Sequence, residues 1–211
     1  MSRNERISMS VIRRLPRYYR FLYDLKQNGV TRISSRELAQ RMHLTASQIR
    51  QDFNCFGEFG QQGYGYMVEQ LYHEIERILG LDQLTPAILI GAGNMGHTIA
   101  TQMHFERRGM KLIGIFDINP QIVGTSIGEL TVLSEDEMVE FCQTNQPEMA
   151  ILCIPKTSAP GVVQQLTELG IKGFWNFSHF DITDAHPDAV VENVHLSDSL
   201  MTLSYRLQQK D

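Results

Sequence analysis

The sequence predicts an α/β fold: an N-terminal winged helix-turn-helix, a Rossmann domain with a doubly wound parallel sheet, and a C-terminal helix. Three observations predict it. Helical patterns precede a stretch with four glycines in ten residues, at 57–66. Apolar strand patterns alternate with helical patterns after residue 85. A glycine-rich loop, GAGNMG, connects the first of these strands to a helix. We expect domains at 1–80 and 85–195, and a dimerisation helix at 196–211.

The formal net charge of −5 is unevenly distributed along the 211 residues. Residues 1–56 contain 11 Lys and Arg against 4 Asp and Glu, whereas residues 85–211 contain 7 against 15. An arginine-rich end favours nucleic-acid binding, although the same residues also suit an ordinary solvated surface. The whole-chain charge therefore conceals a basic N-terminal segment.

Composition excludes several classes of protein. Three cysteines (Cys55, Cys142 and Cys153) are too few for a disulfide framework or a zinc ribbon. The sequence contains no run of about 18 apolar residues, and its first ten residues lack the apolar region of a signal peptide. We expect a soluble, cytoplasmic protein with no membrane partner and no metal; a thiol redox switch, at Cys55 for example, stays an open alternative.

The first two helices have recognisable start and stop signals. Residues 9–25 have apolar side chains at helical spacing, and Pro16 should bend or interrupt that helix. Asn28 and Gly29 suit its end. Ser34 with Glu37 fits a capping box at the start of the second helix.

A third helix, from Thr45, should carry the sequence-reading side chains. Ile49 and Phe53 face inward at helical spacing, and the opposite face is polar: Ser47, Gln48, Arg50, Gln51 and Asn54. Arginine pairs with guanine and Gln or Asn with adenine in the major groove. We expect this helix to enter that groove, with the glycine-rich hairpin beside it. Six arginines would then contact phosphates: Arg13, Arg14, Arg17, Arg32, Arg36 and Arg41.

Strands and helices alternate after a helix at 68–79 and a linker at 82–86. We expect strands at 87–90, 111–117, 149–154 and 173–178, and helices at 94–105, 134–144 and 159–169. Continuous apolar strands between helices are typical of a parallel sheet that is covered on both faces.

The loop Gly91-Ala92-Gly93-Asn94-Met95-Gly96 predicts a dinucleotide site. Gly91 allows the tight turn, Gly93 lets the backbone approach a pyrophosphate, and Gly96 allows close packing. Asp117 ends the next strand, 21 residues after Gly96, where it can accept hydrogen bonds from a ribose. No arginine follows it nearby, which favours NAD over NADP. A tight turn without a ligand is the alternative.

No catalytic group accompanies this loop. Histidines 179, 186 and 195 have no recognisable catalytic spacing, and the chain has no room for a substrate domain. We therefore expect no enzymatic activity and no catalytic residues. Two alternatives remain: an NAD-dependent oxidoreductase with an N-terminal regulatory domain, and a repressor that binds another nucleotide or a CoA-like ligand.

These motifs resemble the Rex family of redox-sensing transcriptional repressors. The resemblance spans nearly the whole chain, from IRRLPRYYRFL and TASQIRQDFNCFGEFGQQGYGY through LIGAGNMG and FDINP to GIKGFWNFS and VENVHLSDSLMTLSYRL. It implies a homodimer with a C-terminal helix swapped onto the partner. It also implies that NADH lowers affinity for operator DNA, whereas NAD⁺ permits binding.

The resemblance assigns individual residues. For the cofactor, Ile154, Pro155, Asn176 and Phe177 match positions at the ends of later strands, and Gly91–Gly96 and Asp117 match the pyrophosphate loop and the ribose acid. Gln48, Arg50 and Asp52 match the recognition helix, and Gly63 and Tyr64 match the wing. Arg20 matches an arginine that pairs with an acid at the start of the swapped helix.

The chain departs from the family at several of these positions. Gln51 replaces a usual lysine, Asn54-Cys55 replaces Ser-Tyr, and Gln62 replaces a wing arginine. His195 stands where the acid for Arg20 is expected, and Gln102 where some members have a tyrosine. We expect the same response to NADH through a different set of contacts.

The C-terminal segment 198–207 has an apolar stripe at helical spacing: Leu200, Leu203, Ser204 and Leu207. The stripe predicts either a dimerisation helix or a terminal helix packed on its own domain.

Overall fold

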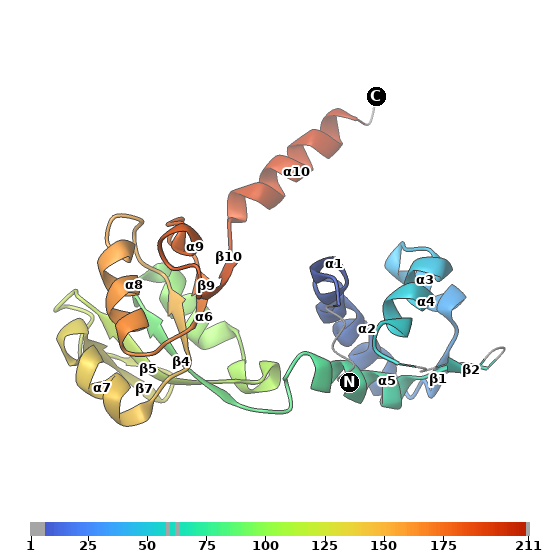
Figure 1. The fold of residues 1–211 in the computed structure, drawn as a ribbon, viewed down its shortest axis with the longest axis horizontal. Helices are drawn as coiled ribbons and strands as arrows, with labels where there is room; N and C mark the ends of the chain where they lie inside the picture. The colour runs from blue at the N-terminus through green and yellow to red at the C-terminus, as the bar shows by residue number, and fades with distance from the viewer. Residues whose placement is uncertain (1–6, 58–59, 62–63, 210–211) are drawn as a thin grey trace. The chain divides into compact units, whose positions relative to one another are not determined.

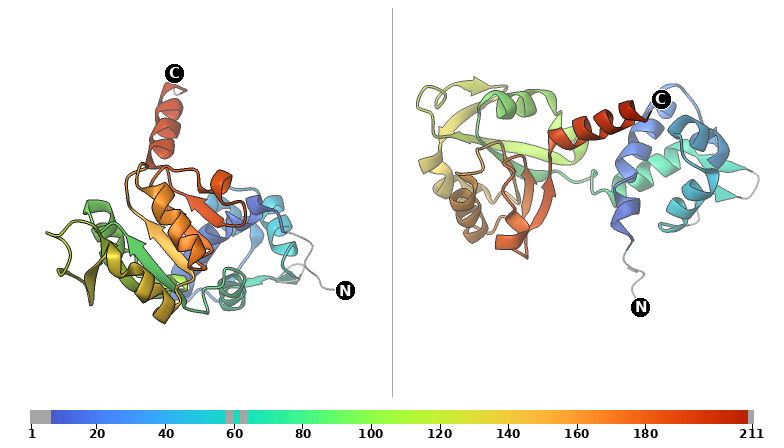
Figure 2. Two further views of the ribbon diagram at one scale, coloured as in Figure 1. Left: turned by 60° about the vertical axis from the view of Figure 1, so that its left-hand side comes forward. Right: turned by 90° about the horizontal axis from the view of Figure 1, so that it is seen from above.

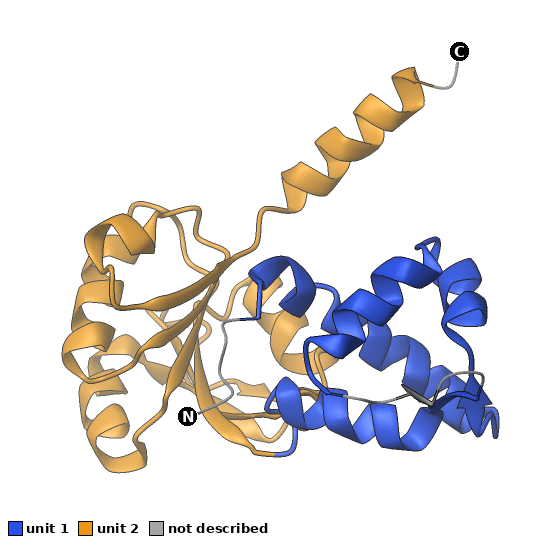
Figure 3. Ribbon diagram, turned by 45° about the vertical axis from the view of Figure 1, so that its right-hand side comes forward, with its two compact units in different colours: residues 1–82 blue, residues 83–211 orange. Residues whose placement is uncertain are grey.

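A computed structural model of the chain describes residues 7–57, 60–61 and 64–209. The predictions for Gly63 and Gln62 therefore lie outside the described residues. The chain divides into two compact units, residues 1–82 and 83–211 (Figure 3). Among the described residues, no helix is long and apolar enough to cross a membrane.

The described residues of the first unit form five helices and a small antiparallel sheet in the order β1-β3-β2 (Figure 1). The elements are α1 (Met9–Ile12), α2 (Leu15–Gln27), β1 (Arg32–Ile33), α3 (Ser35–Met42), α4 (Ala46–Asn54), β2 (Gly60–Gln61), β3 (Gly65–Met67) and α5 (Val68–Ile78). The order of three helices and a hairpin confirms the winged-helix prediction.

Local sequence signals set the helix ends. Pro16 lies in the first turn of α2, because proline lacks an N–H and suits only the start of a helix. The segment 9–25 is therefore two helices, α1 and α2, as the interruption at Pro16 predicts, and α2 continues to Gln27. The capping box of Ser34 and Glu37 is present at the start of α3.

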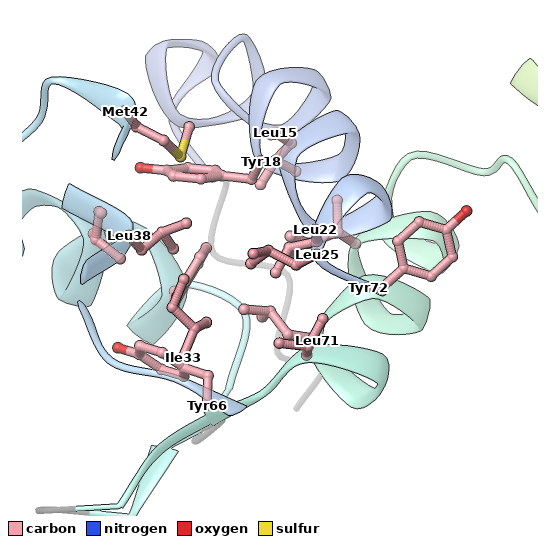
Figure 4. Close-up of a cluster of buried hydrophobic side chains, with 14 of the residues drawn as sticks. Leu15, Tyr18, Leu22, Leu25, Ile33, Leu38, Met42, Tyr66, Leu71 and Tyr72 are labelled. Carbon is pink, nitrogen blue, oxygen red and sulfur yellow. The ribbon is translucent and has the colours of Figure 1, made fainter. Parts of the chain in front are cut away.

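The core of the first unit lies among α2, α3, α4, α5 and the sheet (Figure 4). Its largest fully buried side chains are Tyr18, Phe53, Leu15, Leu22, Leu38, Met42, Ile49, Leu71 and Ile75. Tyr18 and Tyr66 each pack edge-to-face on Phe53, with ring centroids 5.0 and 5.1 Å apart. The apolar face of α4 is therefore fixed in the core, and its polar face is turned outward.

The second unit is a seven-stranded sheet in the order β10-β9-β8-β4-β5-β7-β6, with every pairing parallel except that of β6. This order confirms the doubly wound prediction. The elements are β4 (Thr85–Ile90), α6 (Asn94–Gln102), β5 (Met110–Asp117), β6 (Ser126–Ile127), β7 (Leu130–Ser134), α7 (Met138–Asn145), β8 (Met149–Leu152), α8 (Ala159–Glu168), β9 (Gly173–Asn176), α9 (Ile182–Ala185), β10 (Val190–Asn193) and α10 (Leu196–Gln208), with short 3₁₀ turns η1 (Phe105–Arg108) and η2 (Glu135–Glu137).

Helices cover both faces of the sheet (Figure 2). Side chains of β4 alternate between the two cores on these faces. Ile88 and Ile90 pack with α7 and α8, whereas Leu89 packs with Ile99 of α6 and Phe105. All three β4 side chains are fully buried. A strand buried on both faces reads as a continuous apolar run, which is why AILI was recognisable in the sequence.

Several predicted bounds were wrong. The helix expected at 94–105 ends at Gln102, because His104 adopts a left-handed conformation before η1. The strand expected at 149–154 ends at Leu152, and the strand expected at 173–178 ends at Asn176. The helix expected at 134–144 starts as η2 and continues as α7 to Asn145. Strands β1, β6, β7 and β10 were not predicted. β1 and β6 are two residues long, and polar residues interrupt the apolar pattern of β7 and β10.

Helix α10 buries none of its side chains within the chain. Leu200, Leu203 and Leu207 of the predicted stripe are all more than half exposed, as are Met201 and Tyr205. The helix is drawn as the red segment that leaves β10 in Figure 1. The alternative of a terminal helix packed on its own domain is therefore wrong.

Candidate functional sites

Helix α4 presents the predicted polar face. The hydroxyl of its N-cap, Thr45, accepts a hydrogen bond from the backbone N–H of Gln48 at 3.1 Å. With Ile49 and Phe53 buried, the opposite side chains face solvent and together line one surface depression: Ser47, Arg50, Gln51 and Asn54, with Cys55. The structure thus brings these predicted residues together.

Two arginines near α4 have different surroundings. Arg50 is exposed and donates from Nη1 to the hydroxyl of Ser35 at 3.2 Å, so a second helix, α3, orients it. Arg14 instead donates from Nε and Nη2 to the two carboxylate oxygens of Asp52, each at 2.7 Å. Such a two-point pair fixes the guanidinium of Arg14, the N-cap of α2, against α4.

Sequence reasoning matched Asp52 to the recognition helix but did not find its contacts. Its side chain is fully buried, and Tyr18 and Gln48 also donate to it, at 2.8 and 2.9 Å. Burial alone raises the pKa of Asp52, but the hydrogen bonds from Arg14, Tyr18 and Gln48 outweigh burial, and the pKa lies below its ordinary value. An acid on the inward side of an amphipathic helix is the one sequence signal of such a role.

The wing is a tight hairpin that packs against β1. Gly65 has φ +72°, and a Cβ there would lie 2.6 Å from the carbonyl oxygen of Ile33, so only glycine fits. Tyr64 is exposed, and the guanidinium of Arg32 lies 5.9 Å from its ring centroid. An aromatic and a basic side chain therefore lie together at this edge of the first unit.

The glycine loop between β4 and α6 has the geometry of a pyrophosphate cradle. A Cβ on Gly96 would lie 1.9 Å from the carbonyl oxygen of Gly91, and a Cβ on Gly91, at φ +94°, would lie 2.5 Å from that of Cys153. Gly93, the N-cap of α6, has open space instead. Asn94 and Met95 are exposed in the first turn of α6, where backbone N–H groups favour an anion.

Asp117 at the end of β5 is tied to this loop. Its carboxylate accepts hydrogen bonds from the backbone N–H of Ala92, at 2.6 Å, and of Asn119, at 2.8 Å. Only 9% of the residue is exposed. The acid therefore ties the end of β5 to the glycine loop.

The remaining predicted cofactor residues lie at the same edge of the sheet. Ile154 and Pro155 follow β8, and Asn176 and Phe177 end or follow β9. All four therefore stand at the carboxyl ends of parallel strands, of which β8 pairs with β4 and β9 pairs with β8. Asn176 is buried; its Nδ2 donates to Phe180 and Asn193, and its Oδ1 accepts from Ser178. Asn176 thus organises the loop at this edge. Ligands of open α/β sheets bind at this carboxyl edge.

The two residues assigned to signal transfer are both exposed. Arg20 lies on α2. His195 is the N-cap of α10, and its Nδ1 lies 2.7 Å from Nδ1 of His179, which has φ +61°. A hydrogen bond between the two rings requires one Nδ1 to carry a proton and the other to accept it.

The cysteines and the candidate metal ligands are the other groups in the described residues that could carry chemistry. Burial raises the pKa of Cys142 to about 11 and that of Cys153 to about 12, which disfavours their reactive thiolate forms. Cys55 is exposed, and its Sγ donates to the carbonyl oxygen of Gln51 at 3.3 Å. Across residues 7–57, 60–61 and 64–209, no group of three His, Cys, Asp or Glu residues could hold a metal.

Comparisons with known proteins agree with the division of the chain into two units. Residues 6–54 match a family model described as the N-terminus of putative DNA-binding proteins, and residues 82–180 match a model described as a CoA binding domain. A redox-sensing transcriptional repressor Rex of Caldanaerobacter subterraneus subsp. tengcongensis is 52% identical, over all of this chain and 94% of that protein. One of Clostridium perfringens is 49% identical, over all of this chain and 99% of that protein.

Solved structures also show similarity to a repressor of this kind. A repressor called RSP, in complex with β-NAD⁺ and operator DNA, is 51% identical and superposes with a TM-score of 0.88 over 97% of this chain and 94% of its own. RSP in complex with β-NADH is 48% identical, with a TM-score of 0.87 over 97% and 96%.

Proposed function

Because the chain belongs to the Rex family of redox-sensing transcriptional repressors, we propose that it binds operator DNA in the cytoplasm and releases it when NADH binds. One observation carries the proposal: a repressor about half identical to this chain binds both β-NAD⁺ and operator DNA. The domain bounds proposed are 1–80 for DNA, 85–195 for NAD(H) and 196–211 for dimerisation. NAD(H) is then an effector ligand, and the chain needs no catalytic residue.

The DNA contacts are assigned to the outward face of α4 and to the wing. Arg50 is proposed to read guanine, because its guanidinium is exposed at the centre of that face and oriented by Ser35. The other proposed contacts are Arg14, Ser47, Gln48, Gln51, Asn54, Gly63 and Tyr64. Arg14 uses Nε and one N–H of Nη2 to pair with Asp52. The other N–H groups of its guanidinium remain as donors for a phosphate.

The nucleotide is assigned to the carboxyl edge of the second sheet. Backbone N–H groups from Gly91 to Gly96 would hold the pyrophosphate, and Asp117 would accept from the adenosine ribose. Ile154, Pro155, Asn176 and Phe177 would contact the rest of NAD(H). The shape of the glycine loop supports a bound pyrophosphate. Gly91 and Gly96 have no room for a Cβ, and no atom lies within 4 Å of the Cβ position of Gly93, so a ligand can approach the backbone there.

A homodimer is proposed from α10. The helix exposes six large apolar side chains, and a monomer rarely leaves so contiguous an apolar surface in water. These side chains are Leu196, Leu200, Met201, Leu203, Tyr205 and Leu207. We propose that a second copy of the chain covers them, with α10 swapped onto that copy.

The switch requires NADH to bind one arrangement of the dimer more tightly than the other. A ligand shifts such an equilibrium only by its difference in affinity for the two states. Arg20 and His195 are the proposed signal-transfer residues. Because His195 stands in place of an acid, and Gln102 in place of a tyrosine, the contacts at this switch differ from the family pattern.

A CoA-like ligand is the second candidate, favoured by the match of residues 82–180 to a CoA binding model. An oxidoreductase activity is a further alternative, and the absence of turnover with NADH and small carbonyl compounds would exclude it. Asp117 argues for NAD(H) over CoA, because a carboxylate would repel the 3′-phosphate of CoA as it repels a 2′-phosphate.

The experiment is a fluorescence-anisotropy titration of operator DNA with the full chain, at fixed salt, with NADH, NAD⁺ or CoA added separately. We expect NADH alone to weaken DNA binding. Equal operator affinity with and without NADH would contradict the sensing function, and weakening by CoA alone would favour the second candidate.

A further inference from the structure

The buried carboxylate of Asp52 has a complete set of donors. Arg14 contributes Nε and Nη2, Tyr18 its hydroxyl, and Gln48 its Nε2, at 2.7 to 2.9 Å. Asp52 Oδ1 accepts from Arg14 and Gln48, and Oδ2 accepts from Arg14 and Tyr18. Each oxygen therefore accepts two hydrogen bonds, which satisfies a buried carboxylate.

These donors come from two helices. Tyr18, which is fully buried, lies on α2, and Arg14 is the N-cap of that helix. Gln48 instead lies on α4, one turn before Asp52, and its side chain is partly buried. Asp52 thus connects the start of α2 to one side chain of α4.

This connection determines which way the amide of Gln48 points. An ionised carboxylate can only accept hydrogen bonds, so the nitrogen of the Gln48 amide, and not its oxygen, must face Asp52. One hydrogen of Nε2 is used at 2.9 Å. The second hydrogen and the oxygen Oε1 remain, and no described residue forms a hydrogen bond with either.

An amide oxygen beside an amide N–H is the pair that adenine matches in the major groove, through its N6 amine and N7. Gln48 is the third residue of α4, and N-terminal residues of a recognition helix are the ones that contact base edges. A freely rotating glutamine could turn either group outward, and it would lose rotamer freedom on binding.

We propose that Asp52 is a positioning residue for sequence reading, which holds the Gln48 amide in the orientation that recognises adenine. This inference rests on the proposed DNA-binding function. Asp52 touches no base; it acts through Gln48.

The test is selection of DNA duplexes from a randomised library by the full chain, followed by affinity measurement for each base at each position. The wild-type protein should prefer adenine at one position of each half-site, by about 5- to 150-fold. Gln48→Ala should lose this preference at that position only. Gln48→Glu has no N–H to donate and a charge that Asp52 repels, so it should lose the preference as well.

Two variants test Asp52 itself. Asp52→Ala should lose the same adenine preference while the preferences at positions read by Arg50 remain. The double variant Arg14→Leu/Asp52→Leu removes the ion pair without leaving a charge unpaired, so it should fold even where Asp52→Ala does not, and it should lose the same preference. Tyr18→Phe is the matched control: it removes another donor to Asp52, leaves the Gln48 contact, and should keep the preference.

Retention of the adenine preference in Asp52→Ala or in the double variant would overturn the proposal, as would a Gln48→Ala protein with unchanged preferences at every position. A wild-type chain that selects no sequence at all would contradict the proposed function instead. The two failures are therefore distinguishable.

Discussion

Two buried aspartates, one in each unit, are held by different means. Asp52 accepts only from side chains, two of which lie 34 and 38 residues away in the sequence. Asp117 accepts from backbone N–H groups, one of them on the glycine loop 25 residues away and the other two residues ahead. The first unit therefore fixes its acid by packing whole helices together, and the second by the turn geometry of a strand and a loop.

Loss of the aspartate should therefore have different consequences in the two units. Removal of Asp52 leaves a guanidinium, a buried hydroxyl and an amide without their common partner. Removal of Asp117 leaves two backbone donors, one of which faces the edge where a ligand would bind. We expect the first change to affect folding most and the second to affect ligand binding most.

The largest effect is expected for Asp52→Ala. Breaking a buried ion pair by removing one partner costs several kcal/mol, and because Arg14 is partly exposed we expect a loss of about 3 kcal/mol in the unfolding free energy. Urea denaturation followed by circular dichroism measures it. Asp117→Ala is the comparison and should lose about 1 to 2 kcal/mol. A larger loss for Asp117→Ala would reverse the contrast between the two acids.

The second largest effect is expected on DNA binding, without an effect on NADH binding. Arg50→Ala should weaken specific operator binding by about 100-fold, because a two-point contact to guanine is lost, while NADH binding stays unchanged. Arg36→Ala, on α3, is the matched control: it removes the phosphate contact that we expect of Arg36, so it should weaken all duplexes alike and reduce the salt dependence. Anisotropy at several salt concentrations separates the two. Loss of NADH binding in Arg50→Ala would indicate a misfolded protein.

A smaller effect is expected in the second unit. Asp117→Asn keeps an acceptor for the N–H of Ala92 but loses the charge that strengthens hydrogen bonds to a ribose, so NADH affinity should fall by about 10-fold. Calorimetric titration measures it, with Asp136→Asn as a control for simple loss of charge. Operator affinity of the nucleotide-free variant should equal that of the wild type. A decrease in that affinity would show that Asp117 also supports DNA binding.

The smallest effect appears only in acid. The pKa of Asp52 is lower in the folded protein than its ordinary value of 3.8, so the unfolded chain binds more protons as the pH falls. The stability that Asp52 contributes is complete above about pH 5 and is lost as the pH falls through the folded pKa. Unfolding free energies between pH 3 and 7 should therefore fall less steeply for Arg14→Leu/Asp52→Leu than for the wild type. Equal slopes would mean that Asp52 has no role in acid sensitivity.

The contrast also explains what could be predicted from the sequence. The glycine loop and Asp117 were found because their geometry depends on residues close together around one strand, where local spacing is informative. The polar face of α4 was found because helical periodicity separates it from Ile49 and Phe53. The contacts of Asp52 were not found, because no local pattern indicates that Arg14 and Tyr18 pack against it.

The C-terminal helix α10 was also predicted only in part from the sequence. Its apolar stripe was visible in the sequence, but periodicity does not indicate what covers an apolar face. The exposure of Leu200, Leu203 and Leu207 excludes packing of this helix on its own unit. Strand β7 and the edge strand β10 were missed because their exposed positions disrupt the apolar pattern that reveals a buried strand.

We propose that operator DNA and NADH bind different units and that each weakens the binding of the other. The most direct test is the NADH dissociation constant of the full chain, measured by calorimetry with and without saturating operator DNA. Linkage requires operator DNA to weaken NADH binding by the same factor by which NADH weakens operator binding. We predict equal factors, each well above one. An NADH affinity that is the same with and without operator DNA would contradict the account.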